Sequence, residues 1–217
     1  RNESLSPRSP YTTLQLPKQG IGEWCHPLKT ADIDDSGLRA AVRKGLLETK
    51  LGIPFRTPAE GHNIAFTSLW DNYPDSLEIP LKGKASRAYL LMAGSTNHMQ
   101  CHIDNGVIRI YYKDGTRDVM FLRNPDNWPP IEHIFFEDGL AFNRHTPALY
   151  RLRLKTGEIS NNFGEELGFP GASRELDGGA AVLLEMPLNP GKKLSHLVLE
   201  TLSNDVVIGL MSITLQR

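Results

Sequence analysis

The chain has 217 residues, a length that suits one large all-β domain or at most two small domains. It carries 24 Lys and Arg residues against 25 Asp and Glu residues, so its net charge is −1. This balance argues against nucleic-acid binding and against attachment to an acidic membrane surface, because both need a basic excess. No apolar run approaches the ~18 residues of a membrane-spanning helix, so membrane insertion is not expected.

Residues 1–19 are expected to form a flexible lead or an edge segment. Residues 1–10 are polar and rich in Pro, a composition typical of a disordered segment. Residues 12–16 alternate between polar and apolar and are closed by Pro17, which predicts a strand at the edge of a sheet. Because the chain begins with Arg1 rather than Met, we expect it to be processed or to be a piece of a longer protein.

One short helix is predicted, over residues 36–45. Ser36 is a suitable N-cap and Gly45 a suitable end. Between them, Leu38 and Ala41 lie near one helical face. No other segment of the sequence favours a helix.

From residue 51 onward, apolar and β-branched runs are separated by turn residues, a pattern that predicts β-strands. The predicted strands are residues 63–70, 76–81, 87–93, 107–112, 117–122, 149–154, 180–186, 194–202 and 205–215. The run 87–93 is apolar almost throughout, which predicts a central strand covered on both faces. Gly209, inside the last strand, indicates a bulge or a close backbone contact.

The clearest local signal is a hairpin over residues 107–122. Its two strands flank Asp114 and Gly115, a pair that predicts a two-residue type I′ turn, since both central residues of that turn need positive φ angles. Eight or more strands without long helices between them predict an all-β fold, an antiparallel β-sandwich of jelly-roll type with at most one short helix and less than about 15% helix. Residues 20–217 are expected to form this single domain.

Strong catalytic motifs are absent from the sequence, and the one metal-binding pattern is broken. Asp32 to Gly37 resembles the start of an EF-hand loop, but Arg43 stands where the loop needs a bidentate Glu. A structural calcium ion held by one of these carboxylates and by other loops is one interpretation. An Asx turn with a helix cap is the other. No other cofactor is expected.

Two histidines and a cysteine occur within residues 98–102. On a strand, His98 and His102 would share a face while Cys101 would point away. Zinc needs three or four converging ligands, so we expect loop or rim histidines here and no metal site. Whether Cys25 and Cys101 pair is left open by the sequence.

Glycoside hydrolysis needs two carboxylates roughly 5–9.5 Å apart across a cleft. The sequence offers several loop carboxylates, and no two of them stand out as a pair. The candidates are Asp71, Asp75, Glu132, Glu137 and Asp138.

Tryptophans lie in loops or at strand ends, close to amide and imidazole groups. A sugar presents an apolar face ringed by hydroxyls, so a Trp or Tyr ring beside Asn, Asp or His is suited to bind it. Trp70 comes with Asn72 and Tyr73, and Trp128 lies in the Pro-rich loop 124–130. The alternative is that these indoles are core plugs over the ends of the sandwich, tied by their N–H groups.

Several runs, in their order along the chain, resemble galactose-binding-like β-sandwich modules, which are accessory domains of large bacterial glycoside hydrolases. These runs are residues 52–55 (GIPF), 68–74 (SLWDNYP), 89–95 (YLLMAGS), 111–116 (YYKDGT) and 204–211 (NDVVIGLM) with Thr214 and Leu215. More narrowly, residues 20–217 resemble the C-terminal sandwich of a Bacteroidetes family of unknown function whose members are expected to degrade polysaccharides.

The resemblance implies a jelly-roll fold, a carbohydrate-related setting and export to the periplasm or the cell surface. It favours a non-catalytic module of a bacterial polysaccharide-utilisation protein, which binds glycan or packs against a neighbouring catalytic domain. A glycoside hydrolase or lyase acting through loop carboxylates and a purely structural sandwich are the alternatives. The expected ligand-binding residues are Trp70, Asn72, Tyr73, Asn97, His98 and Trp128.

Overall fold

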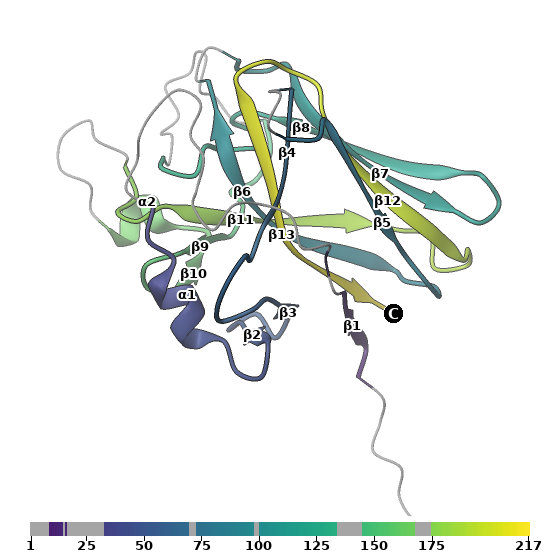
Figure 1. Cartoon of the computed structure of the whole chain (residues 1–217), viewed down its shortest axis with the longest axis horizontal. Coiled ribbons are helices and arrows are strands. Elements are labelled where there is room, and N and C mark those ends of the chain that lie inside the picture. Colours follow the sequence, from purple (N-terminus) through teal and green to yellow (C-terminus); the bar gives the residue numbers. More distant parts are fainter. Residues whose placement is uncertain are drawn as a thin grey trace, which may run out of the picture.

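The computed structural model describes residues 9–14, 16, 33–69, 73–97, 100–133, 145–167 and 175–217. These residues form two antiparallel sheets of seven and four strands, a two-stranded ribbon and two short helices (Figure 1). No helix in this part of the chain has the length and apolar character needed to cross a bilayer.

The seven-stranded sheet is built around β13. Its strands are β1 (Tyr11–Thr13), β13 (Val206–Gln216), β6 (Arg87–Thr96), β11 (Ala180–Pro187), β9 (Arg151–Arg153) and β10 (Ile159–Ser160) in spatial order, with β4 (Ala65–Ser68) also beside β13. Strands β4 and β1 occupy the same edge of β13, one along its first half and the other along its end. The edge strand expected at residues 12–16 is therefore confirmed, at Tyr11–Thr13.

The four-stranded sheet packs against the first. In spatial order it contains β5 (Ser76–Pro80), β12 (Leu194–Thr201), β7 (Asp104–Tyr112) and β8 (Arg117–Arg123). Residues alternate between its two faces, so Ile108 and Ile110 are fully buried while Arg109 and Tyr111, each next in the chain, are partly exposed. The buried residues meet Leu90 of the larger sheet and its neighbours in one continuous core.

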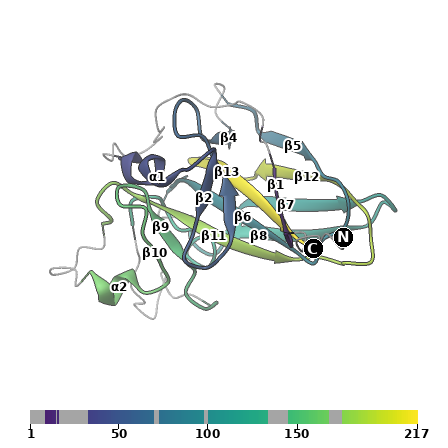
Figure 2. The same cartoon turned by 90° about the horizontal axis from the view of Figure 1, so that it is seen from below.

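A second core covers the other face of the seven-stranded sheet. It is closed by α1 (Ser36–Ala41) and by the ribbon of β2 (Leu46–Glu48) and β3 (Pro54–Arg56), which lie on the side away from β5, β7 and β12 (Figure 2). Phe55 and Leu38 pack there with Leu91 of β6. Because β6 is covered on both faces, its apolar run is explained, and the prediction of a central strand is confirmed.

The remaining strand predictions are confirmed with small changes in their ends, and so is the all-β sandwich. Gly209 makes the expected close contact, since a Cβ there would lie 2.4 Å from the carbonyl oxygen of Ala93. The helices have six and four residues, which keeps the helix content low. The second, α2 (Phe163–Glu166), is a single turn that the sequence did not predict.

The hairpin of β7 and β8 is confirmed, but its predicted turn type was wrong. The N–H of Tyr112 donates to the carbonyl of Thr116 at 2.9 Å, so three residues lie in the loop instead of two. Gly115 has φ +84°, whereas Asp114 is not among the residues with positive φ. The Asp114 carboxylate accepts the N–H of Thr116 at 2.9 Å. A three-residue loop with one left-handed Gly satisfies the strand twist without strain at Asp114.

Helix α1 is shorter than predicted. Asp35, not Ser36, is the N-cap residue, and Val42 after Ala41 is already extended. Gly37 lies so close to the turn after β9 that a Cβ would be 2.1 Å from the carbonyl oxygen of Lys155. This tertiary contact, in addition to the local sequence, determines where the helix sits.

Candidate functional site

Four connections meet at one end of the sandwich, which we call the loop end. Its described residues are 69, 73–75, 97, 100–103, 124–133, 145–146 and 202–205. Register places them together, because Thr96 at the end of β6 pairs with Val206 at the start of β13. Figure 1 shows the ends of β4 and β6 and the start of β13 side by side at the top of the molecule.

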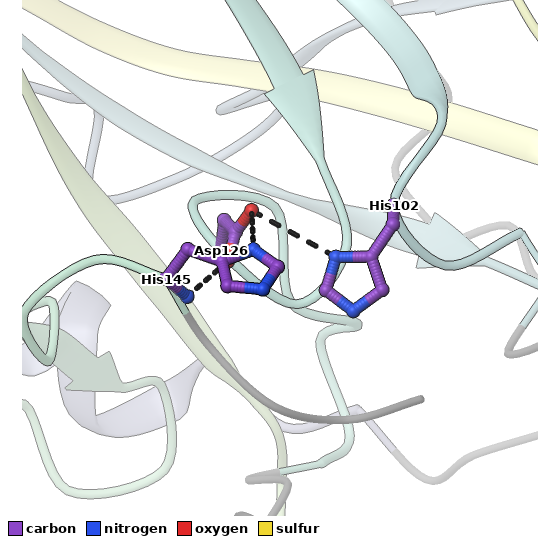
Figure 3. A group of neighbouring side chains, drawn as sticks. All are labelled: His102, Asp126 and His145. Atoms are coloured by element: carbon purple, nitrogen blue, oxygen red, sulfur yellow. Dashed lines mark hydrogen bonds and ion pairs between the residues drawn. The ribbon is translucent and has the colours of Figure 1, made fainter. Parts of the chain in front are cut away.

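Two imidazoles and a carboxylate converge at this end, and we call them the His–Asp–His triad: His102, Asp126 and His145 (Figure 3). Nδ1 of His145 lies 3.5 Å from Oδ2 of Asp126, and Nδ1 of His102 lies 3.9 Å from the same oxygen. The ring centroids of the two histidines are 4.8 Å apart. All three ligand atoms lie within 4.8 Å of one another.

The Asp126 carboxylate is oriented by the chain segment that carries His145. Its Oδ1 accepts the backbone N–H of His145 at 2.7 Å, so its Oδ2 is turned toward the two imidazoles. The hydroxyl of Thr146 donates to the backbone carbonyl of Asp126 at 2.9 Å. These two bonds hold residues 145 and 146 against Asp126, although 18 residues separate Asp126 from His145 in the chain.

The loop that carries Asp126 is anchored by its neighbours. The side chain of Asn127 accepts the N–H of Arg123 and donates to the carbonyl of Phe121, both at 2.8 Å. Trp128 follows with its ring completely buried in the inter-sheet core. The preceding Asn124–Pro125 peptide bond is cis.

His102 is positioned by a left-handed backbone conformation. Its φ of +55° is uncommon for a residue other than Gly, although His tolerates it better than most. Its N–H donates to the carbonyl of Asn124 at 2.8 Å, beside a parallel bridge between Cys101 and Asn124. The same loop, residues 124–128, therefore places both His102 and Asp126.

The three side chains can form ion pairs between histidine and aspartate, or they can bind a metal ion together. Among the residues that the structure describes, the triad is the group of three or more potential metal ligands whose ligand atoms lie close together. Sequence reasoning missed Asp126 and His145, because the three residues are far apart in the chain and their convergence depends on the fold. The only sequence signal was that each lies in a polar loop.

The expected ligand-binding residues have different outcomes. Trp70, Asn72 and His98 lie outside the described residues. Tyr73 lies at the loop end but packs its ring on Phe66 of the second core, with centroids 5.5 Å apart.

Asn97 also lies at the loop end. Its backbone N–H donates to the carbonyl of Asp205 at 3.1 Å, and its carbonyl accepts the N–H of Gln100 at 2.9 Å. Its backbone therefore joins the β6–β7 connection to the β12–β13 connection.

Trp128 is a core residue, which corrects the expectation that it stacks on a ligand. Its exposed fraction is 0%, so neither ring face is open to a sugar. Its Nε1 has no hydrogen-bond partner within the described residues, so the expected N–H tie is not found there either. The burial of a large apolar ring at the root of the loop outweighs the loss of that hydrogen bond.

The candidate carboxylates of a hydrolase are only partly described. Asp71, Glu137 and Asp138 lie outside the described residues, and Asp75 is exposed in the turn before β5. Glu132 is buried close to Arg151. Burial lowers the pKa of Arg151 to about 10, and the Glu132 charge opposes this shift.

In the segment where a calcium ion was predicted, the carboxylates of Asp34 and Asp35 accept hydrogen bonds from nearby groups of the protein. Asp34 Oδ1 accepts the N–H of Ser36 at 2.9 Å, which makes an Asx turn, and bonds to Ser36 lower the pKa of Asp34. Asp35 Oδ2 accepts from both Arg39 and Asn63 at 2.9 Å. The Asx turn agrees with one of the two interpretations, but the helix cap that went with it is not found, because Asp35 at the N-cap makes no side-chain cap bond. The calcium ion stays a prediction. Cys25 lies outside the described residues, so its pairing with Cys101 also stays open.

Exposed apolar side chains accompany the polar groups at the loop end. Leu69 follows β4, Ile103 precedes β7 and Leu202 follows β12, with exposed fractions of 41%, 48% and 38%. A contiguous exposed apolar patch marks an interaction site, whereas single exposed apolar residues are normal. Leu69, Ile103 and Leu202 are additional candidates for ligand contact that the sequence did not single out.

Comparison of the chain with protein-family models, curated proteins and solved structures finds no match. The resemblance to galactose-binding-like modules therefore stays a prediction, and the chemistry of the loop end is the remaining guide to function.

Proposed function

We propose that this chain is a non-catalytic, carbohydrate-associated module that binds glycan through its loop end and acts in the periplasm or at the cell surface. The observation that carries the proposal is the composition of that end, where Leu69, Ile103 and Leu202 are exposed on connections that also carry Asn97, His102 and Asn204. A sugar ring has the matching composition, because its C–H faces are apolar and its rim carries hydroxyls.

The apolar residues lie on strand ends that are tied together. The hydroxyls of Thr67 and Thr201 bond at 2.8 Å across the two sheets, which joins the end of β4 to the end of β12. The N–H of Leu202 donates to the carbonyl of Asn105 at 2.9 Å, next to Ile103. Leu69, Ile103 and Leu202 therefore belong to one region of the surface.

The loop before β7 is held rigid from below by Asn105, which is fully buried. Its Oδ1 accepts the hydroxyl of Thr96 at 2.6 Å, and its Nδ2 donates to the carbonyls of Gln100 and Ile103 at 3.1 Å. A loop fixed before binding loses little entropy when a ligand arrives, which favours affinity. The ring-stacking expectation for Trp128 is not part of this proposal, since that indole is buried.

The expected affinity is modest, about 10⁻³–10⁻⁵ M, since exposed contacts with a hydrated sugar are weak. The test is affinity electrophoresis of the chain in gels that contain soluble xylan, galactomannan, pectin or starch, followed by calorimetry with any polysaccharide that retards it. Ile103→Asp should weaken binding at least ~10-fold, because it adds a charge to the apolar part of the surface.

Val119→Asp is the matched control. Val119 is 41% exposed on β8, on the outer face of the four-stranded sheet and away from the loop end. Its variant should bind like the wild type. Equal weakening by both variants would contradict a loop-end site. No retardation by any of the polysaccharides would argue against glycan binding and favour packing against a catalytic domain by the same surface. Release of reducing ends from a polysaccharide would favour the hydrolase alternative.

A further inference from the structure

We propose that the His–Asp–His triad binds one divalent transition-metal ion, of which zinc is the best fit, through Nδ1 of His102, Oδ2 of Asp126 and Nδ1 of His145. This inference does not rest on the proposed glycan binding.

The distances within the triad suit a shared ion better than direct hydrogen bonds. Separations of 3.5 and 3.9 Å from Asp126 Oδ2 to the two Nδ1 atoms exceed the usual 2.7–3.2 Å of an N–H···O bond. Zinc bonds of about 2.0–2.2 Å at a tetrahedral angle place neighbouring ligand atoms about 3.3–3.6 Å apart. The separation between Asp126 and His145 already has this value, and that between Asp126 and His102 is 0.4 Å longer than the first. The three ligand atoms all lie within 4.8 Å of one another.

The three atoms also have the chemistry of a metal-ligand set. A neutral imidazole presents a lone pair on its unprotonated nitrogen, and a carboxylate oxygen is only an acceptor. In the tautomers that leave both Nδ1 atoms unprotonated, two nitrogen lone pairs and one carboxylate oxygen are available to coordinate one cation. Two imidazoles with one carboxylate are ligands that zinc and similar first-row ions prefer, whereas calcium and magnesium prefer oxygen ligands alone.

The surroundings keep Asp126 available for this role. Its Oδ1 is engaged by the N–H of His145, which leaves Oδ2 directed at the two rings. The nearby guanidinium of Arg123 makes its ion pair with Asp104 at 2.5 Å. Asp104, and to a smaller extent Asp126, raise the pKa of Arg123. The side chain of Asp126 is 15% exposed, so water competes little for its oxygen.

An ion can reach the triad from solvent, because the His145 side chain is 64% exposed and that of His102 is 30% exposed. The three ligands come from three separate parts of the chain, the β6–β7 connection, the loop after β8 and the segment before β9. A bound ion would therefore clamp these parts together. Its fourth position can be filled by water, by an oxygen of a ligand or by another side chain.

The test is calorimetric titration of zinc chloride into the chain after treatment with EDTA, with no glycan present. We expect one saturable site per chain, with no comparable heat from calcium or magnesium chloride. The variants His145→Ala, Asp126→Asn and His102→Asn should each weaken zinc binding by more than about 100-fold, which exceeds the usual effect of residues around the ligands. Asn at 102 tolerates the positive φ, and Asn at 126 keeps the acceptor for the His145 N–H.

His62→Ala is the matched control, since His62 is an exposed histidine that the triad does not include. It should bind zinc like the wild type. The far-ultraviolet circular dichroism of every variant without zinc should match that of the wild type, which excludes misfolding as the cause of a loss. No saturable binding, or unchanged binding by His145→Ala, would overturn the proposal, as would an equal loss in His62→Ala. Because glycan is absent throughout, this result is independent of the glycan test, which can be run in EDTA and again with zinc.

Discussion

The indole of Trp128 packs directly on the backbone of Gly94 in β6, so closely that a Cβ on Gly94 would lie 2.9 Å from Cζ2 of the ring. The carbonyl of Gly94 also accepts the N–H of Ile131 at 2.9 Å. The loop that carries Asp126 is therefore fixed to the central strand of the sandwich at one point. Core packing and the geometry of the triad depend on the same contact.

Trp128→Ala should lower the free energy of unfolding by about 3–5 kcal/mol, because it leaves a large cavity between the two sheets. Urea denaturation followed by circular dichroism measures this change. The variant should also bind zinc more weakly than the wild type, since Asp126 loses its anchor two residues away.

Val119→Ala is the comparison for Trp128→Ala, since it shortens an exposed side chain on β8. It should change the free energy of unfolding by less than about 0.5 kcal/mol. A loss below about 1 kcal/mol in Trp128→Ala would show that the indole does not fill the core as described.

Arg151 is a second anchor, because it ties the segment after Trp128 to β11. Its guanidinium donates to the carbonyls of Pro130, His133, Ala180 and Ala181 at 3.0–3.2 Å. Arg151→Met should lower the free energy of unfolding by about 3–5 kcal/mol, since these buried carbonyls lose their donor. Arg151→Lys should recover only part of this, because an ammonium lacks the planar fork of donors.

Urea denaturation of both Arg151 variants provides the measurement. Full recovery of stability in Arg151→Lys would mean that charge, and not the pattern of hydrogen bonds, is what the site needs. An Arg151→Met variant as stable as the wild type would contradict the anchoring role altogether.

Tyr112 makes the free energy of unfolding depend on pH in the alkaline range. Burial, and then the bond from its hydroxyl to Asp118, raise the pKa of Tyr112 to about 12, although the N–H of Asn189 opposes the shift. A tyrosine in the unfolded chain has a pKa of about 10. The folded state therefore prefers the neutral phenol, and this contribution is complete below pH ~10 and is lost between pH ~10 and ~12.

Tyr112→Phe should be less stable than the wild type at pH 8 by about 1–3 kcal/mol, because Asp118 and Asn189 lose a partner. Urea denaturation at pH 8, 10 and 11.5 should show the difference between the two proteins becoming smaller as pH rises. Since lysines titrate alike in both proteins, the comparison isolates the phenol. A constant or growing difference would contradict the raised pKa.

The strands of this fold could be predicted from the sequence because buried and exposed residues alternate along them. In β7 the sequence alternates Ile108 and Ile110 with Arg109 and Tyr111, and the two isoleucines are buried in the structure. The turn at Asp114 and Gly115 was located correctly and typed wrongly, because a Gly after an Asp suits both a two-residue and a three-residue loop.

The site could be predicted only in part. The polar loops were identified, but the sequence could not decide between a stacking and a core role for Trp128, because a large aromatic ring suits both. Nor could spacing reveal that Asp126 lies beside His102 and His145, since that proximity depends on how the β6–β7 connection and the two ends of the long β8–β9 connection meet at one end of the sandwich.

Zinc should stabilise the folded chain if the triad binds it. At a free zinc concentration 100 times the dissociation constant, the gain is about 2.7 kcal/mol, which corresponds to a rise of roughly 5–10 °C in the unfolding temperature. Differential scanning calorimetry with zinc and then with excess EDTA measures the rise and its reversal. His145→Ala should unfold at the same temperature with and without zinc.

The most direct test of a metal ion at the loop end is a crystal structure of the chain grown with zinc, with diffraction data collected on both sides of the zinc absorption edge. We predict one strong anomalous peak per chain, about 2.0–2.2 Å from Nδ1 of His102, Nδ1 of His145 and Oδ2 of Asp126. A well-ordered triad without such a peak, or a peak bound only by other residues, would contradict the claim.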